Sequence, residues 1–328
     1  MTHLPNTSVS LTRRRLLKSG LTIAGGALIA PALPSWVARP SAAVLPQAAD
    51  PLAPMRAQFA AVPISISKLT DTLAMLSGPG GNMVVMTGPD GKIVVDTFVQ
   101  SVWDKLKAAL DQLGPAKITS LIDTHWHFDH TDNNANFRKA GAVVLAHENT
   151  KKRMGQSHEL LGMKLAPSPE EAWPTQTFAG RHTLNANGET VQLAHVPPAH
   201  TDTDITIRFQ KANVLHMGDL YFEGMYPFID AGTGGTINGM IAAATATLKT
   251  VDGKTTIVPG HGPAGNQASL TKFRDMMATV RERVEKLKKE GRTVEEAVAA
   301  APTKDLDETW GKGFLQPNQF VTIVYNTL

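Results

Sequence analysis

The segment Thr124-His125-Trp126-His127-Phe128-Asp129-His130 is the most informative part of this 328-residue sequence. It holds three histidines and one aspartate within six residues, and it follows the apolar run Ile118–Ile122, which is typical of a buried strand. A loop that leaves a strand can direct several such side chains into one space. Imidazole and carboxylate groups are the ligands that suit zinc where no thiolate is available. The segment therefore predicts a metal site at the end of a strand.

Three further candidate ligands lie downstream in similar positions. His200, Asp219 and His261 each come a few residues after another short apolar run, and glycine or proline next to each of them bends the chain. A single residue of this kind is more often structural, but four such strand ends are hard to obtain by chance. Strand ends that gather at one sheet edge form a shared cleft. We therefore expect these side chains to join those of residues 125–130 in one site.

In this arrangement the sequence resembles the metallo-β-lactamase superfamily. The pattern of that family is H-x-H-x-D-H, then a distal His, a distal Asp or Cys, and a final His near a P-G-H-G turn, and the matching segments span roughly residues 70–262. The resemblance implies an α/β fold, namely an αββα sandwich with two mixed β-sheets flanked by helices. The order of elements read from the sequence agrees, because β-hairpins come first and βα units follow, twice over.

The resemblance also implies a set of metal ligands. Carried over position by position, these are His125, His127 and His200 for a first zinc ion, Asp129, His130 and His261 for a second, and Asp219 as a bridge between the two. The cofactors implied are thus two Zn²⁺ ions. The pattern leaves iron open as the native metal, because sulfur-dioxygenating relatives share the H-x-H-x-D-H string.

The complete absence of cysteine narrows the branches of the superfamily that this sequence can resemble. One subclass of zinc β-lactamases places Cys where Asp219 stands, so the ligand set here resembles the broader lactamase-like, thioesterase, lactonase and phosphodiesterase branches. His127 separates the chain from the flavodiiron branch, which uses Glu at that position. A chain without cysteine also has no disulfide, no iron–sulfur cluster and no thiolate nucleophile.

These residues predict the chemistry of the site. Two metal ions about 3.5–4 Å apart can share a water and lower its pKa to near 7, and the resulting hydroxide would attack a carbonyl carbon. Asp129 is expected to orient that hydroxide as well as to bind metal, which makes it the catalytic candidate. The sequence thus predicts a dizinc hydrolase of small molecules, with β-lactamase-like cleavage of a cyclic amide or ester. Lactonase, thioesterase and phosphodiesterase activity on the same site are the alternatives, and an exported metal-binding protein is the non-enzymatic one.

The N-terminal segment contains a predicted export signal. The segment Thr12-Arg13-Arg14-Arg15-Leu16-Leu17-Lys18 resembles the twin-arginine (Tat) export signal, whose core is S/T-R-R-x-F-L-K. The apolar run Leu21–Ala30 is too short for a bilayer, which needs ~20 residues, and Ser41-Ala42-Ala43 suits a signal peptidase. We expect residues 1–43 to be a Tat-type signal peptide that is cleaved near Ala43. The mature protein would then be periplasmic, with only transient contact to the Tat export machinery.

The net charge of +3 belongs to this signal, because residues 1–43 contain five basic and no acidic side chains. Taking these five from the 32 basic residues leaves 27, against 29 acidic ones, a net charge of −2. No basic run is interleaved with aromatics, so we expect a small-molecule substrate and no nucleic acid. No other apolar segment is long enough to be a stable membrane anchor. The sequence does not predict the oligomeric state.

The sequence also predicts how the mature chain is divided. We expect a flexible N-terminal arm at 44–63, the metallo-β-lactamase-fold domain at 64–266, and a C-terminal helical extension at 267–328 that packs on the same domain. The Pro/Met/Glu-rich stretch 151–178 is interpreted as an insertion or lid. Six aromatic residues lie beside the ligands in the sequence, and each could either pack in the core or form a wall of the substrate pocket. They are Trp126, Phe128, Tyr221, Phe222, Tyr226 and Phe228.

Overall fold

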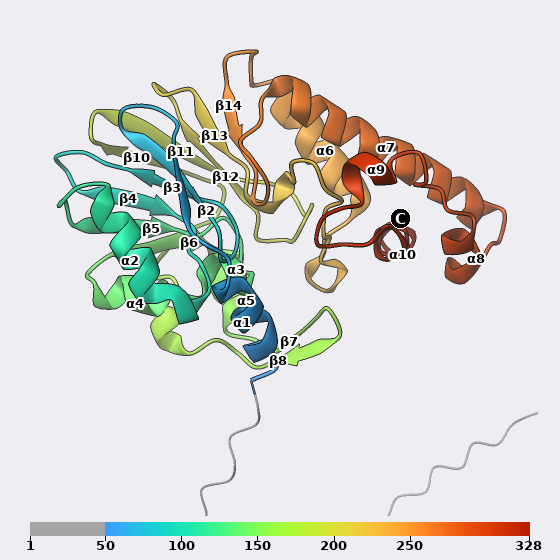
Figure 1. The fold of residues 1–328 in the computed structure, drawn as a ribbon, viewed down its shortest axis with the longest axis horizontal. Coiled ribbons are helices and arrows are strands. Elements are labelled where there is room, and N and C mark those ends of the chain that lie inside the picture. Colours follow the sequence, from blue (N-terminus) through green and yellow to red (C-terminus); the bar gives the residue numbers. More distant parts are fainter. Residues whose placement is uncertain (1–49) are drawn as a thin grey trace, which may run out of the picture. The chain divides into compact units, whose positions relative to one another are not determined.

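A computed structural model describes residues 50–328 as two β-sheets that pack face to face, with helices on the outer face of each sheet (Figure 1). The predicted signal peptide, its cleavage point near Ala43 and the first residues of the predicted arm lie outside the described residues. Within the part that is described, no helix has the length and apolar character needed to cross a bilayer.

The first sheet has seven strands in the order β1-β2-β3-β4-β5-β6-β9. The strands are β1 (Ser65–Lys68), β2 (Leu73–Ser77), β3 (Met83–Met86), β4 (Lys92–Val95), β5 (Ile118–Ile122), β6 (Val143–His147) and β9 (Gln176–Phe178). Pairing is antiparallel from β1 to β4 and parallel from β4 through β5 and β6 to β9. The sheet is therefore mixed, and β4, β5 and β6 end at the same edge.

The second sheet has five strands in the order β10-β11-β12-β13-β14. They are β10 (Arg181–Ala186), β11 (Glu189–His195), β12 (Ile205–Phe209), β13 (Val214–His216) and β14 (Thr256–Val258). Asn187 and Gly188 form the β10–β11 turn with φ of 54° and 72°, as the primed hairpin turns require. Since β12 is antiparallel to both β11 and β13, and β14 is parallel to β13, the strands β11, β13 and β14 end at one edge.

Helices cover the outer faces of both sheets. The α-helices are α1 (Ala53–Ala60), α2 (Trp103–Gln112), α3 (Phe128–Thr131), α4 (Asn134–Lys139), α5 (Glu148–Met154), α6 (Ile237–Leu248), α7 (Gln267–Lys289), α8 (Val294–Ala299), α9 (Asp307–Trp310) and α10 (Pro317–Thr327). The 3₁₀ helices are η1 (Gln100–Val102), η2 (Glu170–Ala172), η3 (Gly218–Leu220) and η4 (Ala231–Thr233). A small separate hairpin joins β7 (His158–Leu160) to β8 (Met163–Leu165).

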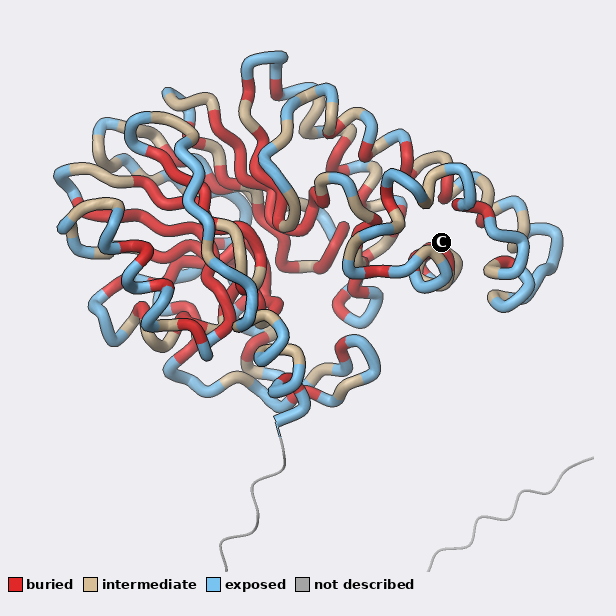
Figure 2. The backbone as a smooth tube through the Cα atoms, viewed as in Figure 1, coloured by how far each residue is buried: buried red, intermediate tan, exposed pale blue. Residues whose placement is uncertain are grey.

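Three apolar clusters correspond to the layers of the sandwich. The middle cluster joins side chains of both sheets, such as Val84 and Val95 from the first and Leu193 and Ile207 from the second. The second packs the first sheet against α2 and α4, and the third packs the second sheet against α6, α7 and the C-terminal helices. Figure 2 shows the buried strands at the centre of the described part. The predicted αββα sandwich with two mixed sheets is confirmed.

The structure differs from the sequence-based expectation in the arm. Residues 53–60 form helix α1, where a flexible segment was expected, and Pro54 stands in its first turn, where proline is well tolerated. The guanidinium of Arg56 makes two 2.7 Å bonds to the carboxylate of Asp132. A helix of eight residues is marginal alone, so contacts made far along the chain stabilise it, and local patterning does not reveal them.

Candidate metal centre

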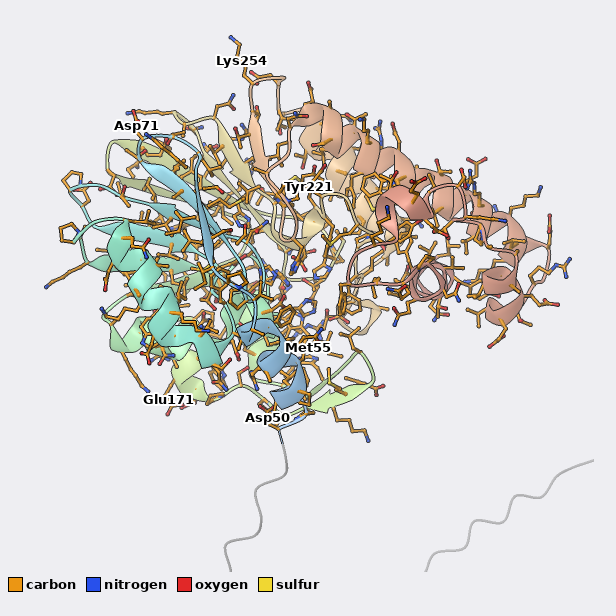
Figure 3. All side chains as sticks on the ribbon, viewed as in Figure 1. Asp50, Met55, Asp71, Glu171, Tyr221 and Lys254 are labelled. Carbon is orange, nitrogen blue, oxygen red and sulfur yellow. The ribbon has the colours of Figure 1, made fainter. Side chains whose placement is uncertain are left out.

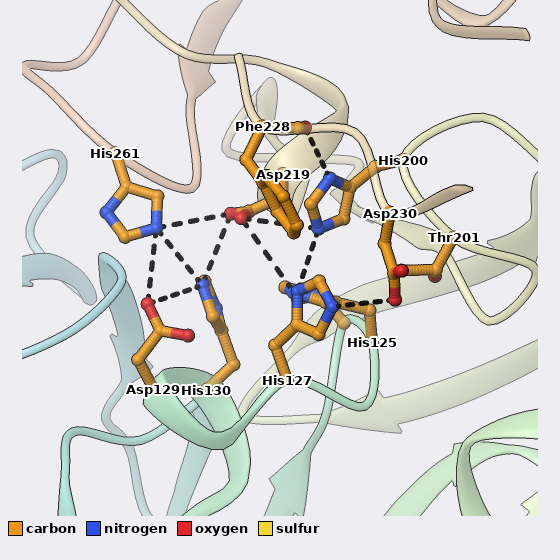
Figure 4. Close-up of polar contacts among 12 residues, drawn as sticks. His125, His127, Asp129, His130, His200, Thr201, Asp219, Phe228, Asp230 and His261 are labelled. Carbon is orange, nitrogen blue, oxygen red and sulfur yellow. Dashed lines mark hydrogen bonds and ion pairs between the residues drawn. The ribbon is translucent and has the colours of Figure 1, made fainter. Parts of the chain in front are cut away.

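The seven predicted ligands converge where the strands end. The loop after β5 carries His125 and His127, and helix α3 follows it at once and carries Asp129 and His130. His200 follows β11, Asp219 lies in η3 after β13, and His261 follows β14. All of the predicted ligands are brought together (Figure 4).

The seven side chains form two groups, each with its ligand atoms within 4.8 Å of one another. The members of the first are His125, His127, His200 and Asp219, and those of the second are Asp129, His130 and His261. In the first group, His200 Nε2 lies 3.0 Å from His127 Nδ1. In the second, His261 Nε2 lies 3.4 Å from both His130 Nε2 and Asp129 Oδ2. The three histidines of the first group and the whole second group are the two sets that the resemblance implies, and Asp219, the implied bridge, falls in the first group.

Asp219 lies between the two groups and faces both (Figure 4). Its Oδ2 is 3.5 Å from His200 Nε2 and 3.8 Å from His125 Nε2. Its Oδ1 is 3.2 Å from His130 Nε2 and 3.5 Å from His261 Nε2. One carboxylate oxygen thus faces each group, as a carboxylate that bridges two metal ions would.

Hydrogen bonds fix the orientation of four of the five rings. The ring nitrogens turned away from the centre are bound as follows: His125 Nδ1 to Thr124 Oγ1 at 2.9 Å, His127 Nε2 to Asp230 Oδ2 at 3.2 Å, His130 Nδ1 to Asp96 Oδ2 at 2.8 Å, and His200 Nδ1 to the Phe228 carbonyl at 2.8 Å. A ring nitrogen held in this way carries the proton and leaves the other one free to bind a metal ion.

Two of these supporting residues, Asp96 and Asp230, were not identified from the sequence. Asp96 is fully buried directly after β4, with φ of 62°, and it also accepts hydrogen bonds from the backbone N–H and the hydroxyl of Thr124. Its place after an apolar strand is the same signal that marked the ligands, so it could have been found. Asp230 has no such signal, because its contact with His127 depends on a long loop.

The electrostatics of the centre favour bound cations. Burial opposes the charged form of His130, but the carboxylates of Asp219, Asp129 and Asp96 outweigh it and raise its pKa well above the usual range. Burial would also favour a neutral Asp219, yet the surrounding His130, His261 and His125 hold its pKa well below the usual range. A site that gathers carboxylates and attracts protons in this way has the charge that a divalent metal ion requires.

Two buried atoms at the centre lack any hydrogen-bond partner, and both indicate a metal site. They are His125 Nε2 and Asp219 Oδ1. Buried polar atoms are nearly always paired, so an orphaned pair at the centre of seven converging ligands requires an explanation. A metal ion in each group would satisfy both atoms. The donor set, five imidazoles and two carboxylates, therefore fits a divalent metal site.

Two glycines make room for these ligands. A Cβ atom on Gly260, in the Pro259-Gly260-His261-Gly262 turn, would overlap Asp219 Oδ1. A Cβ atom on Gly81 would overlap the ring of His130. The P-G-H-G turn thus serves the site twice, because it carries one ligand and leaves space for another.

A cavity of about 100 Å³ opens beside the centre. His127, Asp129, Asp219 and His261 form its polar side. Of the six aromatic residues considered from the sequence, three line this cavity and three are buried in the cores; the first three are Phe128, Phe222 and Phe228, and the others are Trp126, Tyr221 and Tyr226. The centre therefore adjoins a largely apolar chamber.

Comparisons with solved structures agree with the fold. A solved metallo-beta-lactamase from Pontibacter korlensis matches with a TM-score of 0.57 and 15% identity, over 66% of this chain and 99% of that one. The sec-alkylsulfatase Pisa1 from Pseudomonas sp. matches with a TM-score of 0.60 and 17% identity, over 80% of this chain and 50% of that one. At such identities these similarities concern the fold alone.

A curated relative is similar in sequence over part of its length. The 2,4-dinitroanisole O-demethylase subunit alpha of Nocardioides sp. (strain JS1661) is 28% identical over 148 residues, which cover 43% of this chain and 41% of that protein. The chain thus spans about two fifths of the length of this relative.

The sequence model described as "Metallo-beta-lactamase superfamily" matches residues 76–266. Because this match covers more than half of the chain and includes all seven residues at the strand ends, the chain belongs to the metallo-β-lactamase superfamily.

Proposed function

We propose that this protein is a dizinc hydrolase that cleaves a carbonyl substrate, a cyclic amide or an ester. The observation that carries the proposal is the position of Asp219, with one carboxylate oxygen toward each of two groups of ligands. Two divalent ions held by these residues would supply a water with a pKa lowered to about 7 and polarisation of a carbonyl oxygen. Zinc is the first candidate because the donors are imidazole and carboxylate, and iron is the second.

Within this proposal Asp129 is the catalytic residue. Its carboxylate belongs to the second group, with Oδ2 3.4 Å from His261 Nε2, and it also lines the cavity. It can therefore orient the attacking water and accept a proton from it, as general base catalysis requires. Phe128, Phe222 and Phe228 exclude bulk water from the cavity, which strengthens the electrostatic interactions at the reacting atoms.

A second candidate reaction is cleavage of an activated aryl ether. The support is the curated relative, which is named as the alpha subunit of a 2,4-dinitroanisole O-demethylase, together with the aromatic walls of the cavity. Such a reaction would use the same metal centre and the same carboxylate. In the first candidate water attacks a carbonyl carbon and the C–O or C–N bond to the leaving group breaks, whereas in the second water attacks the ring carbon and the ether C–O bond breaks with release of methanol.

A metal analysis combined with a substrate panel tests the proposal. The panel contains nitrocefin, a homoserine lactone, a p-nitrophenyl ester, a p-nitrophenyl thioester, bis-p-nitrophenyl phosphate and 2,4-dinitroanisole. We expect two metal ions per chain and turnover of an ester, lactone or β-lactam that His125→Ala abolishes and Val143→Ala, a change at an exposed position remote from the site, retains. Bound metal without turnover of any compound would instead favour the exported metal-binding protein.

We also propose that the protein acts in the periplasm after Tat export. The support is the Thr12–Lys18 segment, with its paired arginines and the short apolar run that follows. Replacement of Arg13 and Arg14 by Lys should leave the chain in the cytoplasm with its N-terminal segment attached, as cell fractionation and N-terminal sequencing would show. Periplasmic recovery of that variant would contradict the proposal.

A further inference from the structure

Three segments that are far apart in the sequence meet at the mouth of the cavity. Helix α1 contributes Met55 and Phe59, the β7–β8 hairpin contributes Leu160 and Leu161, and the chain between α9 and α10 contributes Phe314. We call these five residues the apolar collar. Figure 1 shows α1 beside α3 and the β7–β8 hairpin, and Figure 3 marks Met55 on α1.

Two of the three segments of the apolar collar make close contacts with the rest of the fold. Arg56 ties α1 to Asp132, just after the ligand helix α3, and the ring of Phe59 lies 6.2 Å from that of Phe128. The C-terminal segment approaches closely at Gly313, where a Cβ atom would press against Met225. The collar thus belongs to the folded structure and lines the same cavity as His127, Asp129, Asp219 and His261.

Two residues of the apolar collar are exposed large apolar side chains that line the same cavity. Phe314 is 55% exposed and Leu161 is 41% exposed. Leu161 stands with Gly162 in the two-residue β7–β8 turn, where both have the positive φ, 52° and 77°, that a primed hairpin turn requires. Exposed apolar groups that gather around one cavity mark a binding site.

The charge and size of the cavity define what it can hold. The ionisable residues that line it are His127, Asp129, Asp219 and His261, and its described lining includes no lysine or arginine. A charged group remote from the metal ions would therefore lose its hydration without gaining a partner, which is costly. A volume of about 100 Å³ is close to that of the engineered apolar cavities, about 150 Å³, that bind benzene.

We propose that the substrates of this centre are neutral esters or lactones that carry one aromatic ring, or an alkyl group of similar size, bound by the apolar collar. This proposal rests on the proposed hydrolase function and specifies its substrate class. The collar disfavours substrates with an anionic tail, because no lysine or arginine lines the cavity and the nearby guanidinium of Arg56 is already paired with Asp132. Phe314 and Leu161 are the specificity-determining residues, since they are the exposed members that a bound ring would cover.

The test uses esters with similar leaving groups, so that only the bound group changes. With the zinc-loaded mature protein, we expect kcat/KM of benzyl acetate or of ethyl phenylacetate to exceed that of ethyl acetate about tenfold, as burial of a ring predicts. A carboxylate on the ring should remove this gain. Phe314→Ala should lower the ring-to-ethyl ratio about tenfold, whereas Val143→Ala, which shortens another exposed apolar side chain that does not line the cavity, should not.

A second measurement separates the collar from the chemistry. Benzyl methyl ether holds the ring without an ester, and its dissociation constant can be measured by calorimetry. We expect Phe314→Ala to weaken its binding about tenfold. Ring-dependent binding without hydrolysis of any ester would overturn the hydrolase function but support the proposal that the apolar collar binds the ring. Hydrolysis with no preference for the neutral ring, or with a preference for the carboxylated ester, would overturn the proposal that the apolar collar selects neutral ring-bearing substrates.

Discussion

Asp230 Oδ2 lies 3.2 Å from His127 Nε2, while the other nitrogen of the same ring, Nδ1, lies 3.0 Å from His200 Nε2. The carboxylate is itself held by the hydroxyl of Thr233 at 2.5 Å and by the backbone N–H of Gly232 at 3.0 Å. Asp230 therefore determines which ring nitrogen of His127 faces the other ligands of the first group. His127 faces the first group through Nδ1, whereas His125, on the same loop, faces it through Nε2.

Substitution of Asp230 tests this orientation. In Asp230→Asn the side chain keeps its size but loses its charge, so we expect the first group to bind zinc 10- to 100-fold more weakly, the usual effect of losing such a partner. Competition with a chromogenic chelator measures this affinity. Asp71→Asn, at an exposed carboxylate in a turn, is the matched control. Equal zinc affinity in Asp230→Asn and the control would show that His127 is positioned by other contacts.

Substitution of Asp219 should affect both groups of ligands at once. Asp219→Asn removes the negative charge that faces His130 and His261 on one side and His200 on the other. We expect the zinc stoichiometry to fall below two and kcat/KM to fall by about 10² or more, because a charged group at the reacting atoms is lost. Circular dichroism should show an intact fold. Full zinc occupancy together with full activity would rule out a bridging role.

The Gly260 position provides a steric test. In Gly260→Ala the new methyl group would overlap Asp219 Oδ1, so Asp219 must move and zinc affinity should fall at least about tenfold. Gly253→Ala is the control, because a Cβ atom there meets no heavy atom within 4 Å. Zinc titration of the two variants makes the comparison. If both variants bind zinc as the parent does, the close approach at Gly260 is not needed for the site.

A pair of histidines away from the centre predicts a pH effect on stability. The rings of His147 and His195 stack at 3.7 Å, and burial together with His195 lowers the pKa of His147 from 6.5 to about 4, although Asp202 opposes the shift. Between these two pH values the unfolded chain binds a proton at His147 that the folded chain does not bind. The free energy of unfolding must therefore fall as the pH falls through this window.

The variant His147→Gln removes this proton-binding site. Urea unfolding at pH 7 and pH 4.5 should show a smaller loss of stability on acidification in His147→Gln than in the parent protein. The comparison between the two proteins cancels the contribution of the metal centre, which both share. An equal loss in the two would mean that His147 titrates alike in the folded and unfolded chains.

The ligand set was predictable from sequence because its signals are local. Three histidines and an aspartate within residues 125–130 follow one strand, and His200, Asp219 and His261 each follow another. The strand-end signals correctly indicated that these residues meet, but the expected single sheet edge was wrong: β5 belongs to the first sheet and β11, β13 and β14 to the second, so the site joins strand ends of both sheets. The αββα layers were implied by the family resemblance, with which the order of the elements agreed.

The parts that were not predicted depend on contacts between distant segments. Asp230 meets His127 across 103 residues, and Arg56 of α1 meets Asp132 across 76. Neither pair leaves a periodic pattern in the sequence. Phe314 stands between two short helices, and only the folded chain shows that it reaches the same cavity as Met55. The substrate pocket, unlike the metal ligands, is therefore a property of the tertiary structure.

The central claim is that two groups of ligands hold two metal ions that together support hydrolysis. The most direct measurement is a zinc titration of chelator-treated protein in which bound metal and ester turnover are followed in the same samples. We predict that turnover is absent without metal, that it reaches its maximum at two zinc ions per chain, and that His125→Ala neither binds the full complement nor recovers activity. Full turnover by the metal-free protein, or by metal-free His125→Ala, would contradict the account.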